Sequence, residues 1–247
     1  MKVVRRCYYF VVGHLSWVVF GSVSLVLNFV CAILLVLPGR ERLGPMARET
    51  IRRLFVAWCA WLHATRLVYI NWQGFTPAAL AGPAVYIANH PSLLDATFIL
   101  ARLPDTICIF KRAVMHNPAL GPAAILAGYA SGDAGVDLIR DVAGRVSDGR
   151  SLLIFPEGTR TRAGVRLNPL KPGFALIAAR AQVPVRVLVI QSSCVLVPKG
   201  SPWWRIPQFP AYVDITLRGE LDPASAENAR ELTIRATEQL SAALAAP

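Results

Sequence analysis

A histidine and an aspartate five positions apart form a pair that can perform acid–base chemistry. His90 and Asp95 follow an apolar run at residues 85–88, in the segment Asn89-His90-Pro91-Ser92-Leu93-Leu94-Asp95. A carboxylate that hydrogen-bonds one imidazole nitrogen fixes the tautomer and raises the basicity of the other nitrogen, which can then deprotonate a substrate hydroxyl. The alternative is that Asn89 or His90 caps a helix and that Asp95 is a solvated acid in its first turn.

A second polar cluster follows another apolar run, at residues 151–155. It consists of Pro156-Glu157-Gly158-Thr159-Arg160, with Arg162 and Arg166 shortly after it. Gly158 lets a ligand approach the backbone closely, and the planar guanidinium of Arg160 is suited to a phosphate. Lys171 and the backbone amides near Gly158 are further candidates for phosphate or oxyanion contacts. The alternative is an ordinary loop between a strand and a helix, with surface arginines.

Both clusters need strands that end in polar turns, and the chain beyond Gly74 provides them. Short β-rich runs alternate with helical ones, which predicts an α/β domain with a mixed, mostly parallel central sheet flanked by helices. We expect strands at residues 67–72, 84–88, 106–110, 151–155, 183–191 and 212–217. We expect helices at residues 91–103, 118–127, 136–147, 173–181 and 224–245. In this interpretation Asp95 lies about one and a half turns into its helix.

The N-terminal part of the chain predicts a membrane anchor. Residues 8–37 contain no Asp, Glu, Lys or Arg, and about 20 apolar residues are enough to cross a bilayer. The segment Pro38-Gly39-Arg40-Glu41-Arg42 follows in place of a small-residue cleavage site, so we interpret an uncleaved anchor. Because the segment exceeds one span, a tilt, a kink and a re-entrant break all remain open.

The stretch after this anchor has the periodicity of an amphipathic helix. Its apolar residues recur on one helical face at Ile51, Leu54, Phe55, Trp58 and Leu62. Such a helix either packs on the catalytic domain or lies in the headgroup layer of a membrane. We therefore divide the chain into membrane-anchoring helices at residues 1–66 and an α/β catalytic domain at residues 67–247.

Composition and charge indicate a membrane surface as partner. Hydrophobic residues make up 54% of the chain and the net charge is +11, which together favour an anionic bilayer. We expect no nucleic-acid partner, because the chain has neither zinc-finger spacing nor an RNA-binding aromatic motif. The five cysteines form no C-x-x-C pair, which fits neither a disulfide framework nor a zinc site and indicates a reducing, cytosol-facing location.

Basic residues flank the apolar segment on both sides. Lys2, Arg5 and Arg6 precede it, and five arginines follow it between residues 40 and 53. The excess on the C-terminal side predicts a catalytic domain that faces the cytoplasm from a bacterial-type inner membrane. Basic residues at both ends also suit a helix that dips into the bilayer and returns.

Taken together, the segments at residues 89–95 and 155–160 closely resemble the two hallmark motifs of the glycerolipid acyltransferase family, which includes the 1-acyl-sn-glycerol-3-phosphate acyltransferases. The resemblance extends over about residues 84–193 and includes Lys171-Pro172-Gly173 and Val183-Pro184-Val185. The N-terminal apolar segment and amphipathic helix are similar to the membrane-seated helices of bacterial members.

This resemblance implies a catalytic role for each cluster. His90 would be the general base, Asp95 its orienting partner, and Glu157, Gly158, Thr159 and Arg160 the acceptor-binding turn. The reaction would move a fatty acyl group from an acyl carrier protein or CoA thioester to a lipid hydroxyl. Such direct attack needs no serine or cysteine nucleophile, no metal and no redox cofactor.

One departure from the family pattern concerns the acceptor. Members that form phosphatidic acid typically carry an I-D-R-like motif between the two hallmarks, and the corresponding stretch here is Gly128-Tyr129-Ala130-Ser131-Gly132-Asp133. Arg140 and Arg145, on the following helix, are possible substitutes for the missing arginine. The departure keeps a non-phosphate acceptor such as lyso-ornithine lipid open, beside lysophosphatidic acid.

Two other classes of protein fit the sequence less well. A lipid hydrolase would use water in place of the acceptor alcohol, but the chain has no G-x-S-x-G elbow to supply a serine nucleophile. A non-catalytic membrane-binding protein on an inactive scaffold is disfavoured because His90, Asp95 and Glu157 are all present.

Overall fold

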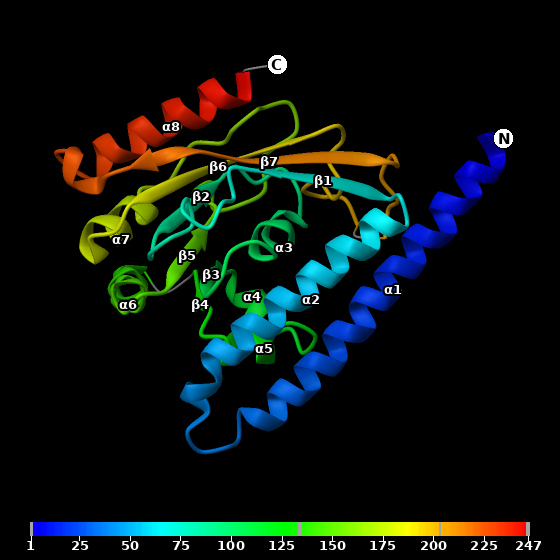
Figure 1. Cartoon of the computed structure of the whole chain (residues 1–247), viewed down its shortest axis with the longest axis horizontal. Coiled ribbons are helices and arrows are strands. Elements are labelled where there is room, and N and C mark those ends of the chain that lie inside the picture. The colour runs from blue at the N-terminus through cyan, green and yellow to red at the C-terminus, as the bar shows by residue number, and fades with distance from the viewer. Residues whose placement is uncertain (1, 133–134, 203, 246–247) are drawn as a thin grey trace.

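A seven-stranded sheet forms the centre of the fold, in a computed structural model that describes residues 2–132, 135–202 and 204–245. The strand order is β1-β7-β6-β2-β5-β3-β4 (Figure 1). All neighbouring strands are parallel except β6 and β7, which are antiparallel. The predicted mixed, mostly parallel sheet is therefore confirmed. The strands are β1 Val68–Gln73, β2 Val85–Ala88, β3 Thr106–Phe110, β4 Ala130–Ser131, β5 Ser151–Ile154, β6 Val185–Ser192 and β7 Ala211–Leu221.

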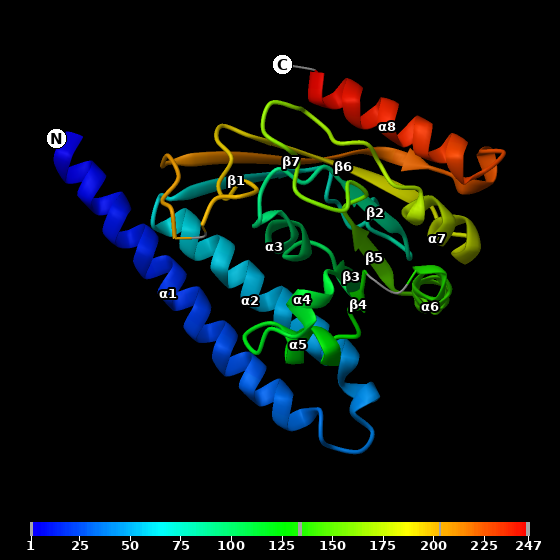
Figure 2. The same ribbon diagram turned by 180° about the vertical axis from the view of Figure 1, so that it is seen from behind.

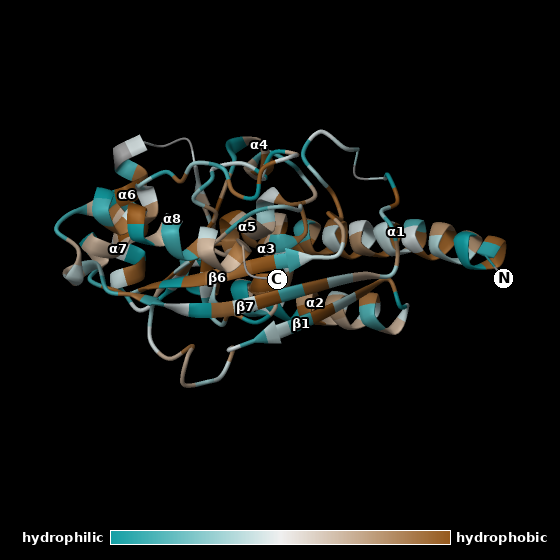
Figure 3. Ribbon diagram, turned by 90° about the horizontal axis from the view of Figure 1, so that it is seen from above, coloured by the Kyte–Doolittle hydropathy of each residue, from teal (hydrophilic) through white to brown (hydrophobic). Residues whose placement is uncertain are grey.

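Burial explains why the central strands have nearly continuous apolar sequences. All four residues of β2 are buried, as are six of the eight in β6, because helices cover both faces of a parallel sheet. In β7, buried Ala211, Val213 and Ile215 alternate with more exposed residues, the period expected of a strand with one solvated face. The apolar stretches of β6 and β7 run side by side in Figure 3.

Helices form a layer on each side of the sheet (Figures 1 and 2). On one side α6, α7 and α8 pack against one another, and on the other lie α2, α3 and α5, with α1 outside them. The helices are α1 Lys2–Leu34, α2 Gly44–Ala64, α3 Asp95–Leu100, α4 Arg112–Met115, α5 Gly121–Leu126, α6 Gly135–Ser147, α7 Gly173–Ala181 and α8 Ala229–Ala245, with short 3₁₀ turns at Arg40–Leu43 and Pro223–Ser225.

The largest difference from the predicted elements lies beside the first polar cluster. The helix expected from residue 91 begins only at Asp95, so this carboxylate stands at the start of α3 and not one and a half turns into it. The backbone just before Asp95 is bonded to the segment around Val197 and does not continue the helix. The Leu93 N–H donates to the Val197 carbonyl at 3.2 Å, and the Val197 N–H donates to Ser92 Oγ at 3.4 Å. Strand β4 and helix α4 were not predicted, and both are short.

Helix α1 turns the buried polar side chains of Ser16 and Asn28 toward the rest of the protein. Trp61 Nε1 donates to Ser16 Oγ at 2.9 Å, and Asn28 Nδ2 donates to the Ala119 carbonyl at 2.7 Å. Asn28 Oδ1 also accepts from the Ala123 N–H of α5 at 2.9 Å. The opposite face is apolar and exposed, with Val11, Val18, Val26 and Phe29 each more than 60% accessible.

Among the described helices, α1 alone is long and apolar enough to cross a bilayer. Helix α2 is instead packed on the domain, because Ile51, Trp58 and Leu62 of its apolar face are all buried. Both helices contribute residues to one continuous hydrophobic core that they share with the sheet. The packing alternative for the amphipathic helix therefore accounts for its periodicity.

Candidate active site

The His90 and Asp95 side chains form a hydrogen-bonded pair where β2 leads into α3. His90 Nδ1 lies 2.9 Å from Asp95 Oδ2, and the Ser92 N–H donates to the same oxygen at 2.7 Å. The Asp95 side chain is 2% exposed, whereas that of His90 is 17% exposed. The acid is therefore shielded from solvent while the imidazole can be reached from outside.

The surroundings of Asp95 determine the tautomer of His90. Burial raises the pKa of the Asp95 carboxyl, while the hydrogen bond and charge of His90 and the Ser92 amide oppose this rise. An ionised Asp95 can only accept, so Nδ1 carries the proton and Nε2 of the neutral ring has a free lone pair. Within the described residues Nε2 has no hydrogen-bond partner, so it is available to a substrate proton.

The ring of Phe155 supports the imidazole from the adjacent strand. Phe155 directly follows β5, and its ring lies 4.0 Å from that of His90 with an interplanar angle of 18°. A parallel stack of this kind fixes the plane of the imidazole while leaving its edge free. This contact was not predicted from the sequence, although Phe155 directly precedes the second cluster.

Glu157 points inward, to the backbone of the first cluster. Its side chain is 4% exposed, and its Oε1 accepts from the His90 N–H at 2.7 Å and from Thr161 Oγ1 at 2.8 Å. Its Oε2 accepts from the Asn168 N–H at 2.9 Å. The Thr161 N–H in turn donates to the His90 carbonyl at 2.7 Å. The carboxylate thus joins the two polar clusters.

Arg160 and Lys171 bring positive charge to the same turn. Arg160 Nη1 donates to the carbonyls of Val197 and Pro198, both at 3.0 Å, and its Nε and Nη2 have no partner among the described residues. Gly158 has a φ of +67°, and a Cβ there would lie 3.0 Å from Lys171 Nζ. The lysine ammonium therefore sits directly over the glycine backbone, and Thr159 beside it is partly exposed.

Two further residues hold these turns, and sequence reasoning did not single out either of them for this role. Asn89 exchanges two hydrogen bonds with the backbone of Ile190 on β6, at 2.9 and 2.8 Å. Asn168, buried, accepts from the Arg162 N–H and donates to the Arg160 carbonyl, both at 3.3 Å. Their only sequence signal was position, since Asn89 begins the first cluster and Asn168 lies shortly after the second.

The stretch that replaces the I-D-R-like motif lies at the edge of the sheet. Residues 130–131 form β4 beside β3, and Asp133 lies outside the described residues. Arg145 Nη1 donates to the Gly128 carbonyl at 2.6 Å, and its guanidinium also pairs with Asp141. Arg145 is thus engaged within the protein, whereas Arg140 is exposed on α6.

The fold and both polar clusters lie within a segment that a known family shares. The Acyltransferase family model matches residues 69–191, which include both clusters. The chain belongs to this acyltransferase family, as the resemblance of its motifs indicated.

Curated relatives carry a more specific description. The 1-acyl-sn-glycerol-3-phosphate acyltransferase of Cocos nucifera is 38% identical over 114 residues, which cover 43% of this chain and 37% of that protein. The enzyme of the same description from Helicobacter pylori strain J99 is 32% identical over 118 residues, covering 45% of this chain and 50% of that protein. The chain thus matches half or less of the length of these two relatives.

A solved structure shares the whole fold. The 1-acyl-sn-glycerophosphate acyltransferase PlsC of Thermotoga maritima superposes with a TM-score of 0.74 at 21% identity, over 99% of this chain and 96% of that chain. This likeness extends the shared architecture to the N-terminal helices.

Proposed function

We propose that this protein is a membrane-bound O-acyltransferase that moves a fatty acyl group from acyl-ACP or acyl-CoA to the hydroxyl of a lysophospholipid. The observation that carries this proposal is the 2.9 Å contact between His90 Nδ1 and buried Asp95, which leaves Nε2 with a lone pair at an accessible position. The family and its curated relatives support an acyl transfer in particular.

The proposed reaction is a direct acyl transfer. Nε2 of His90 takes the proton of the acceptor hydroxyl as its oxygen attacks the thioester carbonyl. The carbon–sulfur bond then breaks, the acyl group stays on the acceptor oxygen as an ester, and the departing thiolate takes the proton from His90. Asp95 keeps the imidazole in the required tautomer and stabilises the imidazolium while it exists.

The preferred acceptor is 1-acyl-sn-glycerol-3-phosphate, which would give phosphatidic acid. Arg160 has two guanidinium nitrogens without a described partner, and Lys171 adds an ammonium over Gly158. Both groups suit a phosphate, and no exposed carboxylate stands between residues 155 and 172 to compete with it. In this proposal Gly158, Thr159, Arg160 and Lys171 contact the acceptor, and Glu157 positions the turn.

A second acceptor is favoured by one specific observation. The stretch 128–132 carries no arginine, and Arg145 beside it is bonded to Gly128 and Asp141. A site that lacks this phosphate ligand can take a lyso-lipid with a different head, such as lyso-ornithine lipid.

The membrane attachment follows from α1. Ser16 and Asn28 are bonded to the protein while the opposite face of α1 is apolar, and a helix that faces lipid requires this division. We place the catalytic domain on the cytoplasmic side of the inner membrane, because basic residues flank α1 and all five cysteines are free thiols.

The acyl chain would lie on the side of the His90 and Asp95 pair that faces α1. There Leu94 and Val197 line a small apolar cavity with Trp58.

The identity of the product tests this proposal. Purified protein in detergent is incubated with labelled acyl-ACP or acyl-CoA and a panel that contains lysophosphatidic acid and lyso-ornithine lipid. Labelled phosphatidic acid is the expected product, and labelled ornithine lipid would select the second acceptor. Free fatty acid as the sole product would contradict acyl transfer and indicate a hydrolase.

A further inference from the structure

The segment that joins β6 to β7 contacts both the catalytic turn and the membrane helix. We call residues 193–210 the strap; Trp203 within it lies outside the described residues. Near its start, Val197 bonds to Ser92 through its N–H and to Leu93 and Arg160 through its carbonyl. This end of the strap is therefore fixed to the turn that carries His90.

The other end of the strap packs on α1. A Cβ on Gly13 of α1 would lie 3.0 Å from Ile206 Cδ1, so the strap side chain fills the space that this glycine leaves. The ring of Phe209 lies 5.9 Å from that of Tyr9. In Figures 1 and 2 the strap accordingly runs beside the N-terminal half of α1.

The outer surface of the strap combines apolar and basic side chains. Val195 is 43% and Trp204 57% exposed, and Lys199 and Arg205 are exposed as well. No Asp or Glu occurs anywhere in residues 193–210. Exposed tryptophan and valine among lysine and arginine is the composition typical of a surface in the headgroup layer of an anionic bilayer.

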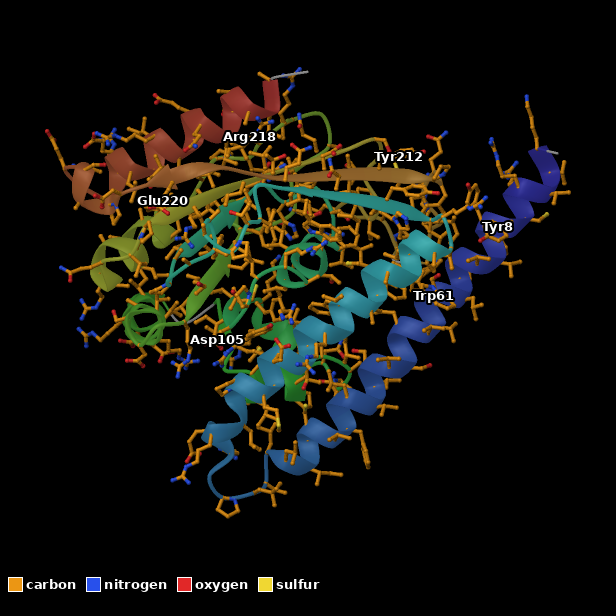
Figure 4. All side chains as sticks on the ribbon, viewed as in Figure 1. Tyr8, Trp61, Asp105, Tyr212, Arg218 and Glu220 are labelled. Atoms are coloured by element: carbon orange, nitrogen blue, oxygen red, sulfur yellow. The ribbon has the colours of Figure 1, made fainter. Side chains whose placement is uncertain are left out.

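The position of Trp204 connects this surface to the apolar face of α1. Trp204 is two residues from Ile206, so its Cα lies within about 7 Å of a residue that touches α1. A helix with its side chains is about 10–12 Å across, so a bilayer that covers the outer face of α1 places its headgroups beside the strap. Figure 4 shows Tyr8, Trp61 and Tyr212 toward this same end, and Asp105 and Glu220 toward the opposite end.

We propose that the strap is a second membrane-contact surface, in which Trp204 and Val195 enter the headgroup layer of an anionic bilayer while Lys199 and Arg205 bind lipid phosphates. This inference rests on the proposed function and deepens it. A strap bound to the headgroup layer would hold His90 and its turn at the level where a lipid acceptor presents its hydroxyl. The occupant is the lipid surface itself, and a carrier-protein contact at the strap is the rival outcome.

A fluorescent probe on the strap tests this contact without any measurement of acyl transfer. Full-length protein with Cys7→Ser and Cys194→Ser receives a thiol-reactive probe at Val195→Cys or, as control, at exposed Glu238→Cys on α8. Cys31, Cys59 and Cys108 are buried, and burial raises the pKa of Cys59 and of Cys108 to about 12, so these three thiols stay unlabelled at neutral pH. The protein is bound to vesicles of equal parts phosphatidylcholine and phosphatidylglycerol, and acrylamide is the neutral quencher.

We expect quenching at position 195 to fall by about threefold or more on vesicle binding, and quenching at position 238 to stay the same. The double variant Lys199→Glu, Arg205→Glu should remove this protection, whereas Arg230→Glu on α8 should not. Equal quenching at both positions on bound protein would overturn the proposal. Protection at 195 only after addition of acyl carrier protein would overturn it too, in favour of the rival outcome. Inactive protein that still protects position 195 would contradict the proposed function alone.

Discussion

The carboxylate of Glu157 accepts a hydrogen bond from the backbone N–H of His90 at 2.7 Å. The two residues follow β5 and β2, which are neighbours in the sheet, so each polar cluster holds the other in place. Resemblance of the motif alone placed Glu157 among acceptor-binding residues, but its carboxylate is buried with three donors around it. We therefore propose that Glu157 is a positioning residue for His90.

Glu157→Gln is expected to lower kcat while leaving the KM for the acceptor nearly unchanged. A glutamine retains an oxygen for the His90 N–H but turns an NH₂ group toward the Asn168 N–H, so one buried donor loses its acceptor. The loss should also reduce the free energy of unfolding by about 1–3 kcal/mol. Steady-state kinetics and denaturant unfolding measure both effects.

The matched variant Thr161→Val keeps both Glu157 oxygens and removes one neutral donor. It should reduce kcat less than Glu157→Gln does. If Glu157→Gln instead raised the acceptor KM more than it lowered kcat, Glu157 would be an acceptor ligand and the positioning role would be wrong.

Asp95→Asn should reduce activity by about 10²- to 10⁴-fold, because an amide no longer selects the Nδ1-protonated tautomer of His90 or stabilises the imidazolium.

The contribution of Asp95 to the stability of the fold should depend on pH. Burial raises the pKa of Asp95 in the folded protein, so folded protein holds this proton more tightly than the unfolded chain does. The stabilising contribution is complete below the unfolded pKa of about 4 and is lost as pH rises through the folded pKa.

Thermal unfolding of wild type and Asp95→Asn at pH 4 and pH 7 checks this sign. The midpoint of wild type minus that of the variant should be larger at pH 4 than at pH 7. A difference that grows toward pH 7 would mean that the folded protein stabilises the ionised carboxylate, contrary to the direction inferred from its burial.

Phe155→Leu should lower kcat by about two- to tenfold, since stacked rings contribute about 0.5–1.5 kcal/mol beyond simple burial. The leucine keeps an apolar contact but lets the imidazole of His90 rotate out of the plane set by the ring 4.0 Å away. Kinetics of Phe155→Tyr provide the control, because the ring remains and most of the rate should return. Equal losses in both variants would show that the stack does not orient His90.

Asn28→Leu should weaken the attachment of α1 to the domain. It removes hydrogen bonds to the Ala119 carbonyl and from the Ala123 N–H, and we expect a loss of about 1–3 kcal/mol for the groups left unsatisfied. Limited proteolysis in detergent should then cut near residues 35–43 faster. The control Phe29→Leu changes an exposed residue on the outer face and should leave the cleavage rate unchanged.

Much of the fold was predictable because burial leaves a direct trace in the sequence. The apolar runs that became β2, β5 and β6 are buried on both faces, and the charge-free segment became α1. The start of α3 was missed because its first turn depends on Val197, about 100 residues away in the chain. The two-residue strand β4 was also missed, because it depends on pairing with β3.

The candidate site was predictable to a similar degree. Residue types and spacing suggested that His90 and Asp95 lie close together, and the structure places His90 Nδ1 2.9 Å from Asp95 Oδ2. They did not reveal that Glu157 turns inward, since an acid in a turn serves a ligand or a backbone N–H equally well. Asn168 and Thr161 carried no signal beyond their proximity to the second cluster, because their role arises only when the loop folds back on the His90 segment.

The most direct test of the central claim compares wild type with His90→Ala in single-turnover acyl transfer from labelled acyl-CoA to lysophosphatidic acid. If His90 is the general base, the rate of phosphatidic acid formation should fall by about 10²- to 10⁴-fold while the unfolding midpoint stays close to that of wild type. Equal rates for the two proteins would contradict the account.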